Sequence, residues 1–486
     1  MFVNVKVKSI NLPLPLYLMY QKRYYLFFLG CLLFGVSLKG QDDAGKYIVV
    51  RDIKIEGNKK TKDYIILREL NFKVGDTLLL AGLQNQFERN KKWFLNTDLF
   101  STIDFNLTEW DLATHQATIK LKVKEAWYIY PLPIVELADR NFNIWWDDHD
   151  HTFDRINLGL AYYQNNFSGR KDRFVVIAQT GFTQKAEVEY GIPYFNKKKT
   201  IGVSGKVSFI RNRSIAYRIE DFKEAFHFSD DAFSLRKFRL NLDWTYRPNI
   251  RLTHTLFTGY HHNRVAGYVV DSLNSHFFGK GLYEELFPSF QYRLRYDLRD
   301  INLYSMTGNL LEFNVGYNGA LKQKGPDMLF TNLYYAQYLK FNHRWSTELI
   351  GKINKFLHYG NPSFYHKSSL GGGEFIRGYE YYVLNGQDFA YAKTSLRFMI
   401  TDKAIPISKF YGTKNIPFRL FLAFNNDFGA IKEQYFPEQN ALSGKMLWGK
   451  GIGLDFVFWQ SRAIQLEYSM NHFGEKGLFL HLKLFN

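Results

Sequence analysis

Apolar and polar residues alternate one by one through most of the chain beyond residue 127. In the segment FRLNLDWTY, residues 238–246, every second side chain is large and apolar, and the residues between them are Arg, Asn, Asp and Thr. The same alternation recurs in residues 311–317, 418–427, 464–470 and 478–485. Because successive side chains of a strand point to opposite faces, this period of two predicts β-strands rather than helices.

The size and length of these apolar faces distinguish two kinds of β-protein. A soluble sandwich also alternates, but a second sheet covers its apolar face. Here the apolar sets are large and continue for about ten residues, the length that a tilted strand needs to cross a bilayer. Backbone groups in lipid must all be paired, so the sheet must close. Residues 127–486 therefore predict a closed antiparallel transmembrane β-barrel of roughly 16 strands, at about 22 residues per strand and connection.

The region before the barrel, residues 47–125, has a different pattern. Alternation predicts a first strand that the turn residues Gly57 and Asn58 end. Thr61 is suited to cap a short helix, and Gly75 separates that helix from a second one. The predicted order is one strand, two helices and two strands (β-α-α-β-β), at residues 49–56, 61–70, 79–95, 103–107 and 119–123. This pattern predicts a small α+β domain.

The first 40 residues have the features of an export signal. The basic stretch QKR leads into the apolar run LFFLGCLLFGVSL and then into KGQDD. That run is too short for a membrane-spanning helix, so residues 1–40 predict a cleaved signal peptide, with Met19 as an alternative start. Cys31, the only cysteine, lies inside the run. A lipoprotein site is the alternative there, but the apolar run continues past the cysteine. The mature chain is then expected to have no thiol chemistry.

Composition and charge agree with a membrane barrel. Aromatic residues make up 18% of the chain, with 45 Phe and 33 Tyr, and the mean hydropathy is −0.29. Lipid-facing and lumen-facing residues cancel in such an average. The formal net charge is +17, with no basic helix or finger pattern, so we expect charged loops, a charged lumen or contacts with lipid headgroups rather than nucleic-acid binding. The run NKKK, residues 196–199, is predicted to be a periplasmic turn with its lysines at the lipid surface.

Three segments carry residues that could serve chemistry. The segment GGGEFIRGYE, residues 371–380, is rich in glycine, but no Lys-Ser/Thr pair or helix follows, which excludes a phosphate-binding loop. An exposed loop is the plainer alternative. WWDDHDHTFD, residues 145–154, is dense in His and Asp, and a solvated hairpin is favoured over a metal site. GVSGK, residues 202–206, lacks the strand-to-helix context of a nucleophile elbow. We therefore expect no catalytic residues, no metal, no cofactor and no enzymatic activity.

Several motifs in order resemble the BamA/TamA superfamily (bacterial surface antigen family). Its members carry periplasmic POTRA domains before a 16-stranded outer-membrane barrel. The POTRA resemblance covers residues 47–125 and rests on the I-x-I-x-G-N opening that includes Gly57 and Asn58, on Gly75 between the helices, and on a closing V-K-E. The barrel resemblance covers the rest, with RYDLRD at 295–300 followed by Gly308, IRGY at 376–379 and DFG at 427–429.

The resemblance implies a role for the glycine-rich segment. In relatives, the loop with this tetrad folds back inside the barrel, and its Arg pairs with an Asp on the inner wall. The matching pair here is Arg377 and Asp427, with Gly378, Tyr379 and Gly429 around it. The alternation of its strand independently points Asp427 inward, and an Arg fork can bind a carboxylate with two hydrogen bonds.

The resemblance also implies a seam between the first and last barrel strands, at Pro131, Leu137, Leu480 and Leu484. It implies an insertase or translocase whose POTRA domain receives unfolded outer-membrane or secreted clients by strand addition. The single POTRA domain favours an accessory paralogue. Membrane lipid, periplasmic chaperones and accessory lipoproteins are the other expected partners.

Two alternatives remain open from the sequence. One is a two-partner-type secretion transporter that passes a dedicated partner through the pore. The other is a passive channel or structural barrel.

Overall fold

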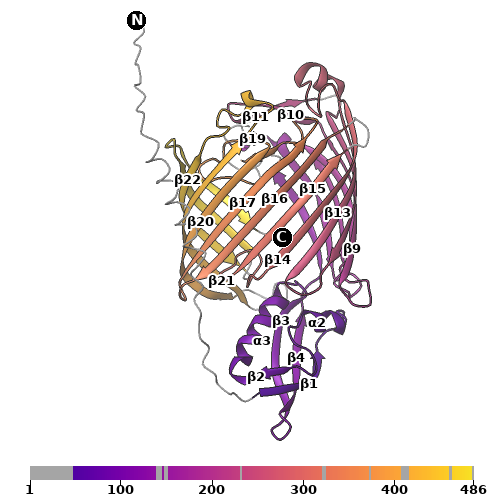
Figure 1. The fold of residues 1–486 in the computed structure, drawn as a ribbon, viewed down its shortest axis with the longest axis vertical. Helices are drawn as coiled ribbons and strands as arrows, with labels where there is room; N and C mark the ends of the chain where they lie inside the picture. The colour runs from indigo at the N-terminus through magenta and orange to yellow at the C-terminus, as the bar shows by residue number, and fades with distance from the viewer. Residues whose placement is uncertain are drawn as a thin grey trace, which may run out of the picture.

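A small N-terminal domain lies beneath one end of a large β-barrel (Figure 1). The fold comes from a computed structural model that describes residues 47–137, 145–146, 151–229, 233–319, 325–370, 374–406, 415–458 and 462–483. The predicted signal peptide lies outside the described residues and stays a prediction. The same holds for residues 147–150 of the segment rich in His and Asp.

The N-terminal domain is a four-stranded sheet packed by two helices. Its elements are β1 (Tyr47–Glu56), α2 (Asp63–Glu69), β2 (Thr77–Leu79), α3 (Leu80–Leu95), β3 (Phe100–Asp111) and β4 (Gln116–Glu125). The strand order is β2-β1-β4-β3, with β1 parallel to β4 and the other pairs antiparallel. The predicted β-α-α-β-β order is confirmed. β2 is an additional strand that the sequence did not predict, because three residues are too few to show a period of two.

The turn from β1 into α2 explains why glycine and asparagine stand there. Gly57 adopts φ +97°, and a Cβ on it would lie 2.0 Å from the carbonyl oxygen of Val123, so only glycine fits. Asn58 Nδ2 donates to the carbonyl oxygen of Thr61 at 2.9 Å. The prediction that Thr61 caps the helix is wrong, because no side chain caps α2. The buried Thr61 hydroxyl instead hydrogen-bonds the Tyr128 hydroxyl at 3.0 Å.

The core of this domain lies between the helices and the sheet. Leu83, Phe87 and Phe94 form the buried face of α3 at helical spacing. They share one apolar cluster with buried residues of α2 and of all four strands. The prediction that this helix face includes Leu79 is wrong, because Leu79 ends β2 and is 60% exposed. Gly75, with φ +92°, makes the turn before β2, and its N–H donates to the carbonyl oxygen of Val50 at 2.8 Å. The domain therefore has its own core.

The barrel wall is one antiparallel sheet of 16 strands, the number expected from the sequence. In chain order the strands are β5 (Ile129–Leu137), β6 (Ile156–Asn165), β7 (Arg173–Gly181), β8 (Thr183–Ile192), β9 (Ile201–Asn212), β12 (Leu235–Tyr246), β13 (Leu252–Val265), β14 (Glu284–Asp297), β15 (Gly308–Gly319), β16 (Asp327–Lys340), β17 (Trp345–Tyr359), β20 (Asp388–Pro406), β21 (Asn415–Lys432), β22 (Leu447–Phe458), β23 (Arg462–Asn471) and β24 (Lys476–Lys483). Each strand pairs with the next in this order, so β5 and β24 are the two ends of the sheet.

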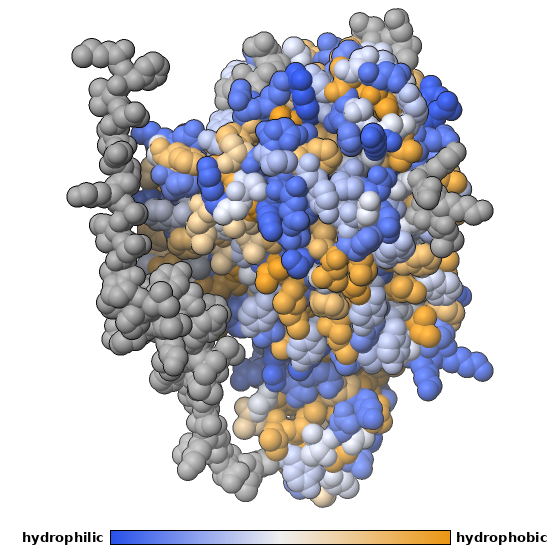
Figure 2. All heavy atoms as spheres, turned by 45° about the horizontal axis from the view of Figure 1, so that its top comes forward, coloured by the Kyte–Doolittle hydropathy of each residue, from blue (hydrophilic) through white to orange (hydrophobic). Residues whose placement is uncertain are grey.

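The outer face of the wall is apolar, as the alternation predicts. On β12 the outward residues are 38–49% exposed, and they are Phe238, Leu240, Leu242, Trp244 and Tyr246. Figure 2 shows apolar side chains gathered on the barrel wall, between polar surfaces at the far end and next to the small domain. Such a belt is the surface that a barrel presents to lipid. In the described ranges, no helix is both long and apolar enough to cross a membrane.

Folded segments cover the barrel end that lies away from the small domain. They include the hairpin β10 (Ser214–Glu220) and β11 (Lys223–Phe228), seen at the top of Figure 1. Phe277 and Phe278 are buried in an apolar cluster there. The carbonyl oxygen of Phe222, at the hairpin tip, accepts a hydrogen bond from the Val383 N–H at 2.6 Å. This contact links the cover to the loop described next.

Candidate functional site

The loop between β18 (Ser368–Leu370) and β19 (Leu384–Gly386) packs against the inner wall of the barrel. We call residues 374–383 the lock loop. The glycine triplet before it, residues 371–373, lies outside the described residues. Ile376 and Tyr379 are each 1% exposed and share a buried cluster with Leu447 of β22. The loop is therefore part of the barrel interior rather than an exposed tip.

Arg377 lies at the centre of a buried network of four charges. Its Nη1 donates to Asp427 Oδ1 at 2.7 Å, and its backbone N–H donates to Asp427 Oδ2 at 3.2 Å. Its Nε lies 2.6 Å from Glu467 Oε1, although the N–H does not point along that line. Lys393 Nζ lies 3.9 Å from Asp427 Oδ2. Two positive and two negative charges thus balance one another where no side chain is more than 14% exposed.

Glu467 was not predicted, although the sequence contains a signal for it. In the segment IQLEYSM it stands between Leu466 and Tyr468, which are 37% and 46% exposed on the outer face. The alternation that points Asp427 inward therefore points Glu467 inward as well. Because an Arg has five N–H donors, a buried Arg commonly needs more than one acidic partner. An inward-facing acid on β23, two strands along from Asp427 on β21, could have been sought on that ground.

Glycines let the loop approach the wall closely. A Cβ on Gly449 of β22 would lie 1.6 Å from the carbonyl oxygen of Arg377, and a Cβ on Gly429 would lie 2.3 Å from Ile376 Cδ1. Gly378 adopts φ +79°, and a Cβ on it would meet the backbone N of Asn471 at 2.4 Å. Side chains at these positions would push the loop off the strands. Gly449 is a further residue that the sequence reasoning missed.

Further contacts fix the loop to the turn between β23 and β24. The Tyr379 hydroxyl hydrogen-bonds His472 Nδ1. Asn471 Nδ2 donates to the carbonyl oxygen of Gly378 at 3.0 Å, and the Tyr382 hydroxyl donates to Glu475 Oε2 at 2.5 Å. The lock loop therefore binds β21, β22, β23 and the turn that leads into the last strand.

The lock loop also contacts β24 itself. The ring of Phe375 stacks on His481, with centroids 4.7 Å apart and planes 11° from parallel. Tyr381 packs edge-on against Phe479, with centroids 5.2 Å apart. These rings lie on the inner side of β24, while Leu480 is 47% exposed on the outer side. Such aromatic contacts are favourable at these distances, so the loop supports the last strand from inside.

The two end strands of the sheet define the seam. Between the described residues of β5 and β24 there is no strand pairing, so the closure expected from the sequence is not found in this part of the chain. Pro131 is exposed and Leu137 half-buried on β5, and Leu480 lies on β24, while Leu484 lies outside the described residues. Pro131 has no N–H to donate, which is typical of an edge strand.

Comparisons with known proteins agree with this architecture. A family model for the POTRA domain, described as a surface antigen variable number repeat, matches residues 48–126. The chain is a POTRA-plus-barrel protein. Given the apolar belt of the barrel, it lies in the outer membrane, with the POTRA domain in the periplasm.

One solved structure with a TM-score above 0.5 shares the fold at low sequence identity, and two others are similar. CdiB from Escherichia coli has a TM-score of 0.54 and 12% identity, and the match covers 90% of this chain and 76% of that chain. BamA from Haemophilus ducreyi lacking POTRA domains 1-3 has a TM-score of 0.49 and 16% identity, covering 89% and 83%. CdiB from Acinetobacter baumannii has a TM-score of 0.48 and 11% identity, covering 90% and 74%. No curated protein matches the chain.

A buried carboxylate fixes the POTRA domain to the periplasmic turns of the barrel. Glu69 of α2 is 3% exposed, and Arg247 donates Nη1 and Nη2 to its two oxygens at 2.8 and 3.1 Å. Lys171 Nζ and the Tyr194 hydroxyl donate to Oε1 at 3.3 and 3.0 Å. Burial acts to raise the pKa of Glu69, but the charges of Lys171 and Arg247 outweigh it and hold the pKa well below its ordinary value of 4.5.

Two more contacts join the POTRA domain to the barrel. The Tyr128 hydroxyl, in the short link from β4 to β5, donates to the carbonyl oxygen of Leu99 at 2.9 Å. The RYDLRD turn lies beside α3, where Asn96 Nδ2 donates to the carbonyl oxygen of Asp300 at 3.2 Å. Because the link to β5 is packed into the POTRA core, a movement of the POTRA domain would act directly on the first seam strand.

Proposed function

We propose that this protein is an outer-membrane insertase or translocase. Its POTRA domain receives unfolded outer-membrane or secreted proteins, and its barrel inserts or exports them. With a single POTRA domain, it acts as an accessory paralogue for a narrow set of clients, alongside periplasmic chaperones or accessory lipoproteins. It uses no catalytic residue, metal or nucleotide, because the pairing of client strands supplies the free energy for their insertion or export.

The observation that carries the proposal is the seam. The described parts of β5 and β24 have no strand partner on the side where the barrel would close. Free strand edges present unpaired N–H and C=O groups that template pairing with another chain. In lipid those groups must be satisfied, so an incoming client strand would gain backbone hydrogen bonds at this place. An uninterrupted barrel wall would offer no such edge.

The POTRA domain has an edge suited to the preceding step. β3 is the last strand of its sheet and runs for 12 residues. Strand addition at such an edge binds an extended peptide mainly through its backbone, so it suits clients of varied sequence. The same domain is joined to β5 through the packed link at Tyr128. Client capture and the seam are therefore mechanically connected.

The first experiment closes the seam with a disulfide. Cys31 is the only cysteine of the natural sequence, so a disulfide within one chain of such a variant involves at least one introduced cysteine. Cysteine pairs between residues 131–137 of β5 and residues 480–483 of β24 should, when oxidised, abolish client delivery, and a reductant should restore it. A matched control places the pair at Leu160 and Ala178, which already face each other in β6 and β7. Full delivery with an oxidised seam would count against the proposal.

The second experiment distinguishes the alternatives by where clients crosslink in living cells. A photo-crosslinker at Leu480, or on β3, should trap outer-membrane proteins, while one at Leu286 on the outer face of β14 should not. A secretion transporter would instead give adducts with one secreted partner at lumen-facing positions such as Asn314. A passive channel would give no client adducts at any of these positions, and the purified barrel would conduct ions.

A further inference from the structure

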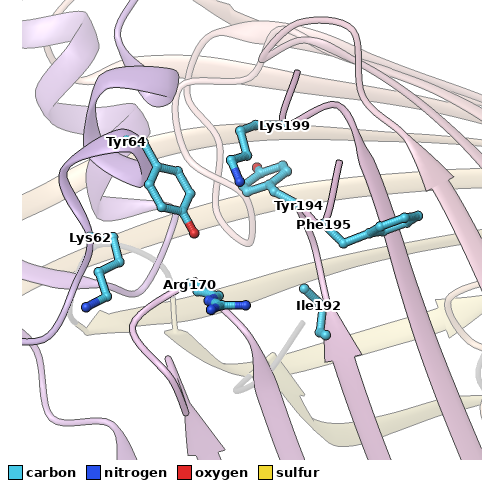
Figure 3. Close-up of a pocket in the computed structure, with 7 residues that line it drawn as sticks. All are labelled: Lys62, Tyr64, Arg170, Ile192, Tyr194, Phe195 and Lys199. Carbon is cyan, nitrogen blue, oxygen red and sulfur yellow. The ribbon is translucent and has the colours of Figure 1, made fainter. Parts of the chain in front are cut away.

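A hollow of ≈ 320 Å³ lies where the POTRA domain meets the barrel. Figure 3 shows its lining, which comes from the start of α2 and from the periplasmic turns of the barrel. The lining residues are Lys62, Tyr64, Arg170, Ile192, Tyr194, Phe195 and Lys199. Lys199 belongs to the NKKK turn, whose charges the proposed function does not use.

The lining is positive and lacks acidic residues. Lys62, Arg170 and Lys199 supply three cations, and no carboxylate lines the hollow. In the described part of the chain, none of these three side chains forms an ion pair. Lys199 Nζ lies 4.4 Å from the centre of the Tyr64 ring, so an aromatic face is its nearest partner. The nearby carboxylate of Glu69 is held by Arg247 and Lys171. The hollow thus offers positive charge that the protein does not neutralise.

The hollow opens towards the lipid side of the wall. Ile192 lies on the same face of β8 as Val188 and Tyr190, which are 49% and 38% exposed. Phe195, in the turn after β8, is 51% exposed. Val207 of β9 lies opposite Val188 and is 44% exposed, so an apolar strip runs from the hollow along the wall. Cations below an apolar strip match a lipid, whose phosphate is charged and whose chains are apolar.

We propose that this hollow binds the phosphate headgroup of an anionic phospholipid in the periplasmic leaflet of the outer membrane. Lys62 and Arg170 contact the phosphate from the two sides, Lys199 closes the third side, and the acyl chains lie along the strip above Ile192. Phe195 lies at the membrane interface, where aromatic side chains are enriched. An acidic peptide would have no use for the apolar strip, so the observations favour a lipid.

The bound lipid would link two parts of the molecule. Lys62 belongs to the POTRA domain, whereas Arg170 and Lys199 belong to barrel turns. A headgroup held by all three would strengthen the docking that Glu69 provides from the buried side. The lipid composition of the leaflet would then influence the orientation of the POTRA domain.

The test measures lipid binding to the full chain by native mass spectrometry, with phosphatidylglycerol and phosphatidylethanolamine as probes. The pocket variant carries Lys62→Ser and Lys199→Ser. The matched control carries Lys197→Ser and Lys198→Ser, which remove the same charge from the same region outside the hollow. At about 1 kcal/mol per basic residue, the pocket variant should bind phosphatidylglycerol about 25-fold more weakly, and the control should match the wild type.

A variant that misfolds is recognised by heat-modifiable gel migration. Arg170→Gln, which leaves α2 untouched, then replaces the double variant, with an expected loss of about 5-fold. Equal weakening by the pocket and control variants would overturn the proposal in favour of diffuse surface charge. Displacement of the lipid by equimolar inorganic phosphate would make this a free-anion site instead. Displacement by an oligoglutamate peptide would make it a peptide site, and either result would overturn the lipid assignment.

Discussion

Replacing Arg377 by alanine should strongly destabilise the barrel, because this side chain holds two buried carboxylates. It leaves Asp427 and Glu467 buried, with Lys393 as the one remaining cation of the network. Removing one partner of a buried ion pair costs about 3–5 kcal/mol, because the other charge is stranded. Since the side chains of Asp427 and Glu467 are 0% and 3% exposed, water can restore little of that loss. We therefore expect Arg377→Ala to lower the free energy of unfolding by about 4 kcal/mol.

The geometry predicts an asymmetry between the partners. Asp427→Asn keeps the shape of the side chain and leaves Arg377 with Glu467, 2.6 Å from its Nε. We expect that variant to lose about 1–3 kcal/mol, the usual loss for one charged hydrogen bond. In the Arg377→Ala background, the same Asp427→Asn change removes a stranded charge. Its effect there should be near zero or stabilising, which corresponds to a coupling of at least about 1–3 kcal/mol.

The assay is urea unfolding of the four proteins of this cycle in one detergent, followed by heat-modifiable gel migration. Arg295→Ala serves as the matched control, because Arg295 pairs with Glu312 and Asp297 at 2.9 Å each but is 36% exposed, and Asp297 keeps Arg299 as a partner. A partly solvated pair is worth about 0–1 kcal/mol, so this control should change little. If the Arg377 and Asp427 effects simply add, the two side chains do not interact in the folded protein and the reasoning fails.

Three other predictions can be checked on the same protein. Gly449→Ala should displace the lock loop and destabilise the barrel by about 1–3 kcal/mol, whereas Gly205→Ala, where a Cβ meets nothing within 4 Å, should not in the same urea titration. Because the folded pKa of Glu69 is depressed, its contribution to docking is fully present above about pH 4.5 and is lost as the pH falls further. Inter-domain distances measured by spin labels should widen in acid in the wild type, and Glu69→Gln should remove that pH dependence. Deleting residues 47–124 should leave a heat-modifiable barrel that no longer delivers clients, because the deleted domain has its own core.

The repeated patterns of the chain could be predicted from sequence, and the irregular contacts could not. A period of two over many strands fixes which face of the wall each residue occupies, so Phe238 outward and Asp427 inward follow from the alternation alone. The prediction that Thr61 caps α2 fails because its hydroxyl forms a hydrogen bond with Tyr128, a partner 67 residues away. β2 is too short to have a period, and Glu69 and Arg247 meet only because two domains pack together. Local sequence carries no signal for such long-range pairing.

The lock loop and the seam share one structural element, and this connection gives the network at Arg377 a role beyond stability. The loop is held to β21 and β23 by charge, and it reaches β24 through the rings of Phe375 and Tyr381. β24 has β23 as its one strand partner among the described residues, so its other support comes from inside the barrel. Loosening the loop would therefore leave the last strand with fewer contacts than any interior strand of the wall. In the proposed function, the last strand needs a free edge for the client strand and a fixed position in the wall. The lock loop supports that position through Phe375 and Tyr381, and it forms no strand pair with β24 in the described part of the chain.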